Sequence, residues 1–262
     1  MKVGGVVKII FLLVMLFVNA GHSFTLICNG ECPNLKGWEG EELAIELNAT
    51  DCPSGITQEI EEAFNVWNQV STAKLKLKLG GANNESVAVI VNRVATTPAV
   101  HAPVITCDAA FQTTFSLSAD EVDGILGVGL AETVGGDTLN TGFIVLNTQP
   151  GAGGNIASQS AIQRKIVIAH ELGHMLGIGH SAEFSALMFF NIGEKGNLRR
   201  HQDDADAYSY LYPKSEPGDG FLGCGSIHLP GGGNPPSSVS WLLLALPMIF
   251  WLRLRQSLTL TS

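Results

Sequence analysis

The sequence predicts one domain of the α/β (α+β) class, built on a mixed β-sheet, with a segment of different composition at each end. Stretches with strand or helix periodicity follow one another in the order β-α-β-β-β-β-α-α, which fits a sheet covered by helices. The composition supports a folded domain, because 45% of the 262 residues are hydrophobic and only 15% are charged. The 24 acidic and 15 basic residues give a formal charge of −9, which argues against nucleic acid as a partner.

The first strand and the first helix are each predicted by a clear periodicity. Residues 42–47, Glu-Leu-Ala-Ile-Glu-Leu, alternate as in a strand with one buried face. Pro53-Ser54-Gly55 then begins a helix that runs to about residue 70. Its apolar residues recur every three or four positions and form one stripe, which consists of Ile56, Ile60, Phe64 and Trp67.

Four further strands are expected in the middle of the chain. Residues 73–79 alternate Lys and Leu, which predicts a half-exposed strand, and the apolar residues 87–94 predict a more fully buried one. Residues 125–130 and 141–147 predict two more strands, separated by a Gly-Gly-Asp turn. The intervening residues 96–118 show little pattern, and we expect a long surface loop there.

Two helices complete the predicted domain, a long one at residues 161–175 and a short one at residues 201–211. The short helix has aspartates near its start, where negative charge interacts favourably with the helix dipole. The long helix ends with His170-Glu171-Leu172-Gly173-His174, which contains H-E-x-x-H. His170 and His174 lie one turn apart on the same face, so their imidazoles can share one zinc ion. Glu171 is then close enough to accept a proton from a water that the zinc activates.

A catalytic zinc ion needs a third protein ligand and one open position, and His180 is the candidate ligand. In a continuous helix, His180 would lie about 15 Å along the axis from His170, beyond reach of the same ion. The helix must therefore end before it, and Gly177 stands where a glycine with positive φ can end a helix. The other histidines have no such context and are expected at the surface; they are His22, His101, His201 and His228.

The complete motif H-E-x-x-H-x-x-G-x-x-H, residues 170–180, resembles that of the metzincin clan of zinc endopeptidases. Ser181 is similar to the residue that follows the third histidine in the matrixin (M10, matrix metalloproteinase-like) branch. Met188 resembles the methionine of the turn that supports the metal site in this clan. The similarity covers about residues 38–212. It implies a metzincin-like catalytic domain with a twisted mixed five-stranded sheet, a long active-site helix and a C-terminal helix.

The sequence also departs from the matrixin pattern. Phe190 stands where matrixins usually have a proline, two residues after the turn methionine, which puts the wall of the specificity pocket in doubt. No cysteine-switch sequence of the Pro-Arg-Cys-Gly type precedes residue 38, so latency through a propeptide thiol is not expected. Calcium is a further candidate cofactor, although a solvated acidic loop is the favoured explanation of its candidate ligands, Asp120, Glu121, Asp123 and Asp137.

A protein or peptide substrate is expected to bind as an extended strand added to an exposed sheet edge. Residues 125–131 are the candidate for that edge. The two glycines of this segment would allow another backbone to approach closely. The expected substrate-contacting residues are Gly127, Val128, Gly129 and Leu130.

The N-terminal segment, residues 1–23, has the features of a secretory signal peptide. Two lysines precede an apolar run of about ten residues, and cleavage after Ala20 or Ser23 fits the small residues that follow. The alternative is an uncleaved membrane anchor. An exported chain places the catalytic domain, residues 24–212, outside the cytoplasm, secreted or anchored at the cell surface.

The C-terminal part divides into a Gly/Pro-rich linker, residues 213–238, and an apolar anchor or sorting tail, residues 239–255. Arginines close the tail, and the positive-inside rule places them in the cytoplasm, so we expect the tail to engage a membrane or a sorting machinery. The alternatives are a lipid-anchor signal and a buried C-terminal helix.

The five cysteines are consistent with disulfides in an exported chain. Cys28, Cys32, Cys52 and Cys107 can form two bridges in any of three pairings, whereas Cys224 lies in the linker. A zinc knuckle at the C-x3-C spacing of Cys28 and Cys32 is the less favoured alternative.

The predicted function is that of a zinc metalloendopeptidase. A non-catalytic, zinc-stabilised extracellular binding or adhesion module is the main alternative, but structural zinc sites usually have four protein ligands that include cysteine. An astacin-like metzincin is a third possibility, because tyrosines at 208, 210 and 212 follow Met188, although Ser181 opposes it. The oligomeric state is not predicted.

Overall fold

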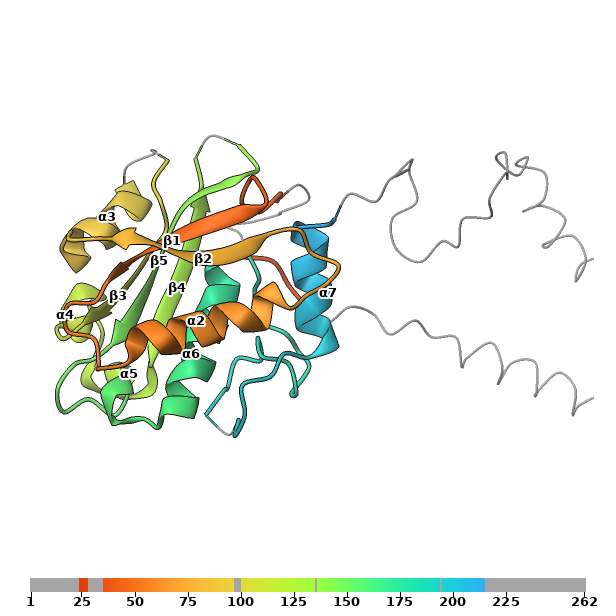
Figure 1. Ribbon diagram of the computed structural model, residues 1–262. Coiled ribbons are helices and arrows are strands. Elements are labelled where there is room, and N and C mark those ends of the chain that lie inside the picture. Colours follow the sequence, from red (N-terminus) through yellow and green to blue (C-terminus); the bar gives the residue numbers. More distant parts are fainter. Residues whose placement is uncertain (1–23, 28–34, 97–99, 135, 194, 215–262) are drawn as a thin grey trace, which may run out of the picture. The chain divides into compact units, whose positions relative to one another are not determined.

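The computed structural model describes residues 24–27, 35–96, 100–134, 136–193 and 195–214 (Figure 1). The predicted signal peptide and tail, all of the predicted linker after residue 214, and Cys28, Cys32 and Cys224 therefore lie outside the described residues. The strands are β1 (Glu42–Asn48), β2 (Lys76–Ala82), β3 (Val104–Asp108), β4 (Gly127–Thr133) and β5 (Leu139–Asn147). The helices are α2 (Ile56–Asn68), α3 (Val87–Thr96), α4 (Phe111–Thr114), α5 (Ala119–Gly124), α6 (Ala161–Met175) and α7 (Gln202–Leu211). None of the helices within these ranges has the length and apolar character needed to cross a membrane.

The five strands form one mixed sheet in the order β2-β1-β3-β5-β4. The β1–β2, β1–β3 and β3–β5 pairs are parallel, whereas β4 runs antiparallel to β5, with Leu130 opposite Phe143. The prediction of a mixed five-stranded sheet is confirmed. Strand β4 lies at one end of the order, so one of its edges has no strand partner in the sheet.

Helices cover both faces of the sheet, because the side chains of the central strands alternate between two hydrophobic clusters. In β5, Ile144 and Leu146 belong to the cluster that contains the buried residues of α2 and α6. Phe143 and Val145 point the other way and pack with residues of α3 and α5. Helices α2 and α6 run close together on their face of the sheet (Figure 1).

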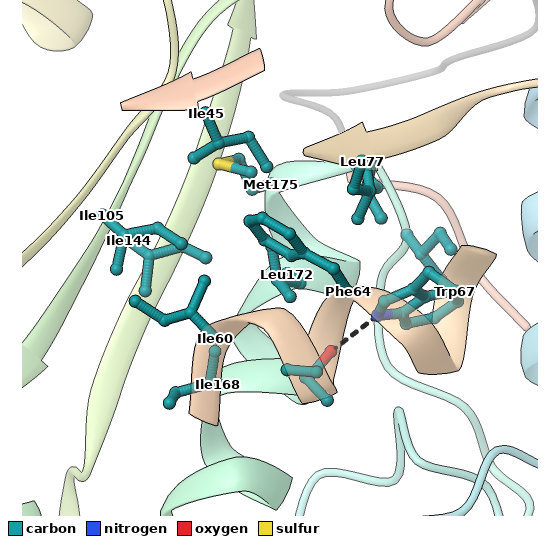
Figure 2. Close-up of a cluster of buried hydrophobic side chains, with 14 of the residues drawn as sticks. Ile45, Ile60, Phe64, Trp67, Leu77, Ile105, Ile144, Ile168, Leu172 and Met175 are labelled. Carbon is teal, nitrogen blue, oxygen red and sulfur yellow. Dashed lines mark hydrogen bonds between the residues drawn. The ribbon is translucent and has the colours of Figure 1, made fainter. Parts of the chain in front are cut away.

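The larger cluster fixes α6, the helix that carries the predicted motif. The predicted stripe of α2 is buried, and Figure 2 shows Phe64 and Trp67 beside Leu172 of α6. The indole Nε1 of Trp67 donates a hydrogen bond of 3.0 Å to the carbonyl oxygen of Ala169, one residue before the first histidine of the motif (Figure 2). Each such buried side chain contributes about 1.5–3 kcal/mol. The position of α6 is therefore determined by packing against α2 and the sheet.

The prediction of a strand at residues 87–94 is wrong, because Val87–Thr96 form α3. The buried residues Ile90 and Val94 and the partly buried Val87 and Val91 pack on one cluster. Their spacing of three and four residues is that of a helix face, and exposed Val89 lies outside it. The abundance of β-branched residues concealed this period, because a short apolar run is ambiguous between a buried strand and a helix.

The prediction of a long surface loop at residues 96–118 is also wrong. Val104–Asp108 form β3, which lies in the centre of the sheet, and α4 follows it directly. All five residues of β3 are buried, so the strand has no alternation of polar and apolar residues. The sheet has the expected number of strands because β3 occupies the place assigned to residues 87–94.

One disulfide, Cys52–Cys107, joins the loop after β1 to the central strand β3 across a sequence separation of 55 residues. This bridge is one of the pairings left open by the sequence. A loop of this length implies stabilisation of about 2–5 kcal/mol, because the crosslink restricts the unfolded chain.

We expect the double variant Cys52→Ala/Cys107→Ala to unfold at a lower urea concentration than the wild type, by the equivalent of about 2–5 kcal/mol. Equilibrium unfolding followed by tryptophan fluorescence measures the change. The wild type under reducing conditions provides the control, since its free energy of unfolding should fall by a similar amount. An unchanged midpoint in both would show that the bridge contributes nothing.

Candidate active site

The C-terminal end of α6 brings the third histidine back towards the first two. Helix α6 ends at Met175, and Gly177 follows with a φ of 92°. The amide of Ile178 donates to the Gly173 oxygen and the amide of Gly177 to the His174 oxygen, both at 2.9 Å, which is a Schellman motif. Positive φ is strained for any residue with a Cβ, so glycine is the residue suited to this turn. The predicted helix end at Gly177 is therefore present.

His170, His174 and His180 converge on one point. Their candidate ligand nitrogens all lie within 4.8 Å of one another, and within the described residues they form the only group of three or more possible ligands. The ring centroids are separated by 4.7, 5.4 and 4.8 Å. His170 is buried, His174 is half-buried and His180 is exposed, so the cluster opens to solvent on one side.

Hydrogen bonds fix which nitrogen of each helical histidine faces this point. Nδ1 of His170 is 2.8 Å from the Leu187 oxygen, and Nδ1 of His174 is 2.9 Å from the Ile178 oxygen. Because a carbonyl oxygen only accepts, each Nδ1 carries the hydrogen and each Nε2 is left with a lone pair. Burial lowers the pKa of His170 to about 3 and that of His174 to about 4, so both rings are neutral at pH 7. Three imidazoles, open to solvent on one side, suit zinc with one open coordination position.

Glu171 lies beside the histidine cluster in the wall of the same cleft, with 7% of its surface exposed. Burial raises the pKa of its carboxyl group to about 7, opposed by a hydrogen bond from the backbone of Gly129. A carboxyl group with a pKa near neutrality can both accept and release a proton at pH 7.

The turn that contains Met188 lies beneath the cluster. Met188 is fully buried, and a Cβ added to Gly173 would be 2.2 Å from its sulfur, so the side chain packs directly on α6. The buried carboxylate of Asp204, in α7, accepts the amides of Leu187 and Met188 at 2.8 and 2.9 Å. Since the Leu187 oxygen accepts from His170, Asp204 supports the position of His170 through this turn. The sequence suggested only a helix-dipole role for Asp204.

An open cleft of about 690 Å³ runs past the histidines and Glu171. One wall is formed by residues 124–129, at the start of β4, and the other by Phe190, Asn191, Ile192 and Gly193. The structure thus places Gly127, Val128 and Gly129 in the cleft wall on an edge strand. Val128 and Leu130 are half-buried and pack on the cluster of the opposite face.

Close approach of a substrate backbone to Gly127 and Gly129 stays a prediction, and the element that approaches both glycines in the structure is α6, through the side chain of Glu171 at Gly127 and its backbone at Gly129. A Cβ on Gly127 would lie 3.2 Å from Cγ of Glu171, and a Cβ on Gly129 would lie 2.3 Å from the Glu171 carbonyl oxygen. These contacts set the distance between Glu171 and the edge strand.

We expect Gly129→Ala to destabilise the protein by about 1–3 kcal/mol, because the methyl group would push β4 and α6 apart. The rate of peptide cleavage should also fall, because Glu171 would move together with α6. Gly81→Ala in edge strand β2 is the matched control, because a Cβ there meets nothing within 4 Å. The urea midpoints of unfolding and the cleavage rates of both variants are the measurements. Equal effects of Gly129→Ala and Gly81→Ala would show that the contact between Gly129 and α6 does not matter.

A short extended segment, residues 25–27, contacts the segment that leads to His180, which the sequence did not suggest. Leu26 pairs antiparallel with Ile178, the Ile27 amide donates to the Gly177 oxygen at 2.9 Å, and the Gly179 amide donates to the Thr25 oxygen at 2.8 Å. The Thr25 hydroxyl also donates to the His180 oxygen at 2.8 Å. The backbone of the third histidine is therefore held from its outer side.

Comparison with known families agrees with this geometry. The family model Peptidase_M10, matrixin, matches residues 38–213. The chain belongs to the matrixin family. Over 50 residues it is 46% identical to interstitial collagenase from Sus scrofa and 44% identical to that from Oryctolagus cuniculus. Over 52 residues it is 42% identical to matrix metalloproteinase-18 from Xenopus laevis. Each alignment covers 19% of this chain and 11% of the relative.

Two of the candidate calcium ligands, Glu121 and Asp123, have other hydrogen-bonding partners in this matrixin. Asp120, Glu121 and Asp123 lie in α5, and Glu121 forms a capping box with Ser118. One oxygen of Asp123 accepts the amide of Gly153 at 2.7 Å. Calcium binding at these residues and Asp137 stays a prediction.

Proposed function

We propose that this matrixin is a zinc endopeptidase that hydrolyses peptide bonds of extracellular proteins. The observation that carries the proposal is the convergence of three imidazoles beside Glu171 in a cleft bordered by an edge strand. His170, His174 and His180 are the proposed zinc ligands. When bound, zinc lowers the pKa of a coordinated water and polarises the scissile carbonyl.

Glu171 is the proposed general base and acid. As the water oxygen bonds to the carbonyl carbon, the carboxylate accepts the water's proton. When the C–N bond breaks, Glu171 delivers this proton to the leaving nitrogen. No other described carboxylate lines the cleft, which leaves the proton transfer to Glu171.

The substrate is proposed to lie extended along β4, with main-chain hydrogen bonds to residues 127–130. Secretion through the signal of residues 1–23, and anchoring through residues 239–255, remain part of the proposal.

The test is cleavage of casein and of a proteome-derived peptide library by the purified protein. We expect cleavage to stop with a zinc chelator and to resume when zinc is added back. A protein that binds one zinc ion per chain yet cleaves nothing would instead support the non-catalytic binding module.

A further inference from the structure

A second cavity adjoins the catalytic cleft across the loop that follows Met188. Its volume is about 390 Å³. Its lining includes Phe184, Asn191, Lys195, Arg199, Arg200 and His201. Exposed Asn191 lines both this cavity and the cleft. The cleft and the second cavity are therefore neighbours that share Asn191 as a lining residue.

The second cavity is basic in an otherwise acidic protein. Among the described residues, its lining contains Lys195, Arg199 and Arg200 and no carboxylate, although the whole chain carries a formal charge of −9. Lys195 donates to the Phe184 oxygen at 2.9 Å, and Arg200 donates to carbonyl oxygens of α2 and its C-cap. These acceptors are neutral, so both positive charges persist. Arg199 is exposed, and no ion pair or hydrogen bond of its side chain is found among the described residues.

The two described carboxylates that interact with the charge of Lys195 belong to Glu183 and Asp204, and neither of them lines the cavity. Glu183 accepts the amide and the hydroxyl of Ser185, and Asp204 accepts backbone amides of the Met188 turn. The charged side chains in the described lining of the cavity are therefore all cationic.

Exposed aromatic rings connect the cavity with the cleft. Phe184, at the cavity, is 63% exposed, and Phe190, in the cleft wall, is 66% exposed. The ring of Phe189 lies 5.3 Å from the first and 4.5 Å from the second. Exposed apolar side chains grouped at a binding cleft indicate a surface that a ligand covers.

We propose that this cavity is a second substrate subsite that binds an acidic segment of the polypeptide whose scissile bond lies in the cleft. The occupant follows from charge complementarity and from continuity with the cleft through Asn191. Carboxylates of the substrate pair with Arg199 and Lys195, and its apolar side chains cover Phe184 and Phe190. This inference rests on the proposed function and names the class of substrate that the site selects.

The test compares two fluorogenic peptides that are identical except that one carries three glutamates where the other carries three glutamines. These residues lie about four to eight positions from the scissile bond. One pair of peptides carries them on the N-terminal side of the bond, and a second pair carries them on the C-terminal side. We expect the acidic peptide to have a kcat/KM about fivefold higher through a lower KM, and the difference to shrink at high salt. Arg199→Glu should abolish the preference for the acidic peptide over the glutamine peptide. Lys36→Glu, an equal change of charge at an exposed position outside the cavity, is the matched control.

Equal kcat/KM values for the two peptides at low salt, or a preference that survives in Arg199→Glu, would overturn the subsite. Fluorescence anisotropy of the same labelled peptides separates this result from failure of the proposed function. Tighter binding of the acidic peptide that depends on Arg199 supports the subsite even if no peptide is cleaved. Arg199-dependent binding to anionic vesicles, without any peptide preference, would assign the surface to a membrane and reject the proposal.

Discussion

Glu171→Ala is expected to lower kcat/KM for peptide cleavage by about 10²- to 10⁴-fold, the usual contribution of a general acid and base. The histidines do not depend on Glu171 for their hydrogen bonds, since His170 bonds to Leu187 and His174 to Ile178. We therefore expect the variant to retain about one zinc ion per chain. Fluorogenic peptide kinetics and elemental analysis of the same preparation measure both quantities.

Glu61→Ala is the matched control for this substitution, because Glu61 is an exposed carboxylate on the neighbouring helix α2. It should cleave peptides at the wild-type rate. Cleavage by Glu171→Ala at the wild-type rate would remove Glu171 from the mechanism, and loss of zinc from that variant would make it a metal ligand instead.

His180→Ala should weaken zinc binding by about 100-fold or more. Loss of an outer partner of a metal ligand already weakens binding by about 10- to 100-fold, and here a ligand itself is removed. Cleavage should fall in parallel, and the rise in melting temperature that zinc gives the wild type should shrink. Competition with a fluorescent zinc chelator and thermal unfolding with and without zinc provide the measurements.

His101→Ala is the control for the histidine substitution. His101 lies outside the cluster of possible ligands, so its replacement should leave the zinc affinity unchanged. Unaltered zinc affinity in His180→Ala would exclude His180 from the ligand set and leave two helical histidines, too few for the proposed site.

The features predicted correctly from the sequence depend on local pattern. The span of α6 agrees with its prediction, because periodicity, motif and helix-ending glycine all lie within one short stretch. The convergence of the histidines follows from the same stretch, since Gly177 returns the chain by a turn of local hydrogen bonds. The predicted bounds of β1 and β5 lie within two residues of the observed bounds, because these strands too are marked by a local pattern.

The features that were missed depend on contacts distant in sequence. Strand β3 is central and buried on both faces, so no alternation marks it, and α3 is helical because Ile90 and Val94 share one buried face. The support that Asp204 gives to Leu187, and that Thr25 gives to His180, joins residues 17 and 155 positions apart. Periodicity in the sequence does not indicate hydrogen bonds between residues so far apart in the chain.

The contacts of residues 25–27 with the segment before His180 affect how the protein should be produced. A shortened recombinant chain that begins at Trp38, where the family match starts, would lack these residues and leave the Gly179 amide and the Gly177 oxygen to water. An affinity tag fused directly before Phe24 would lie beside the segment that carries His180. Tags are therefore better placed at the other terminus, and the recombinant chain should start no later than Phe24.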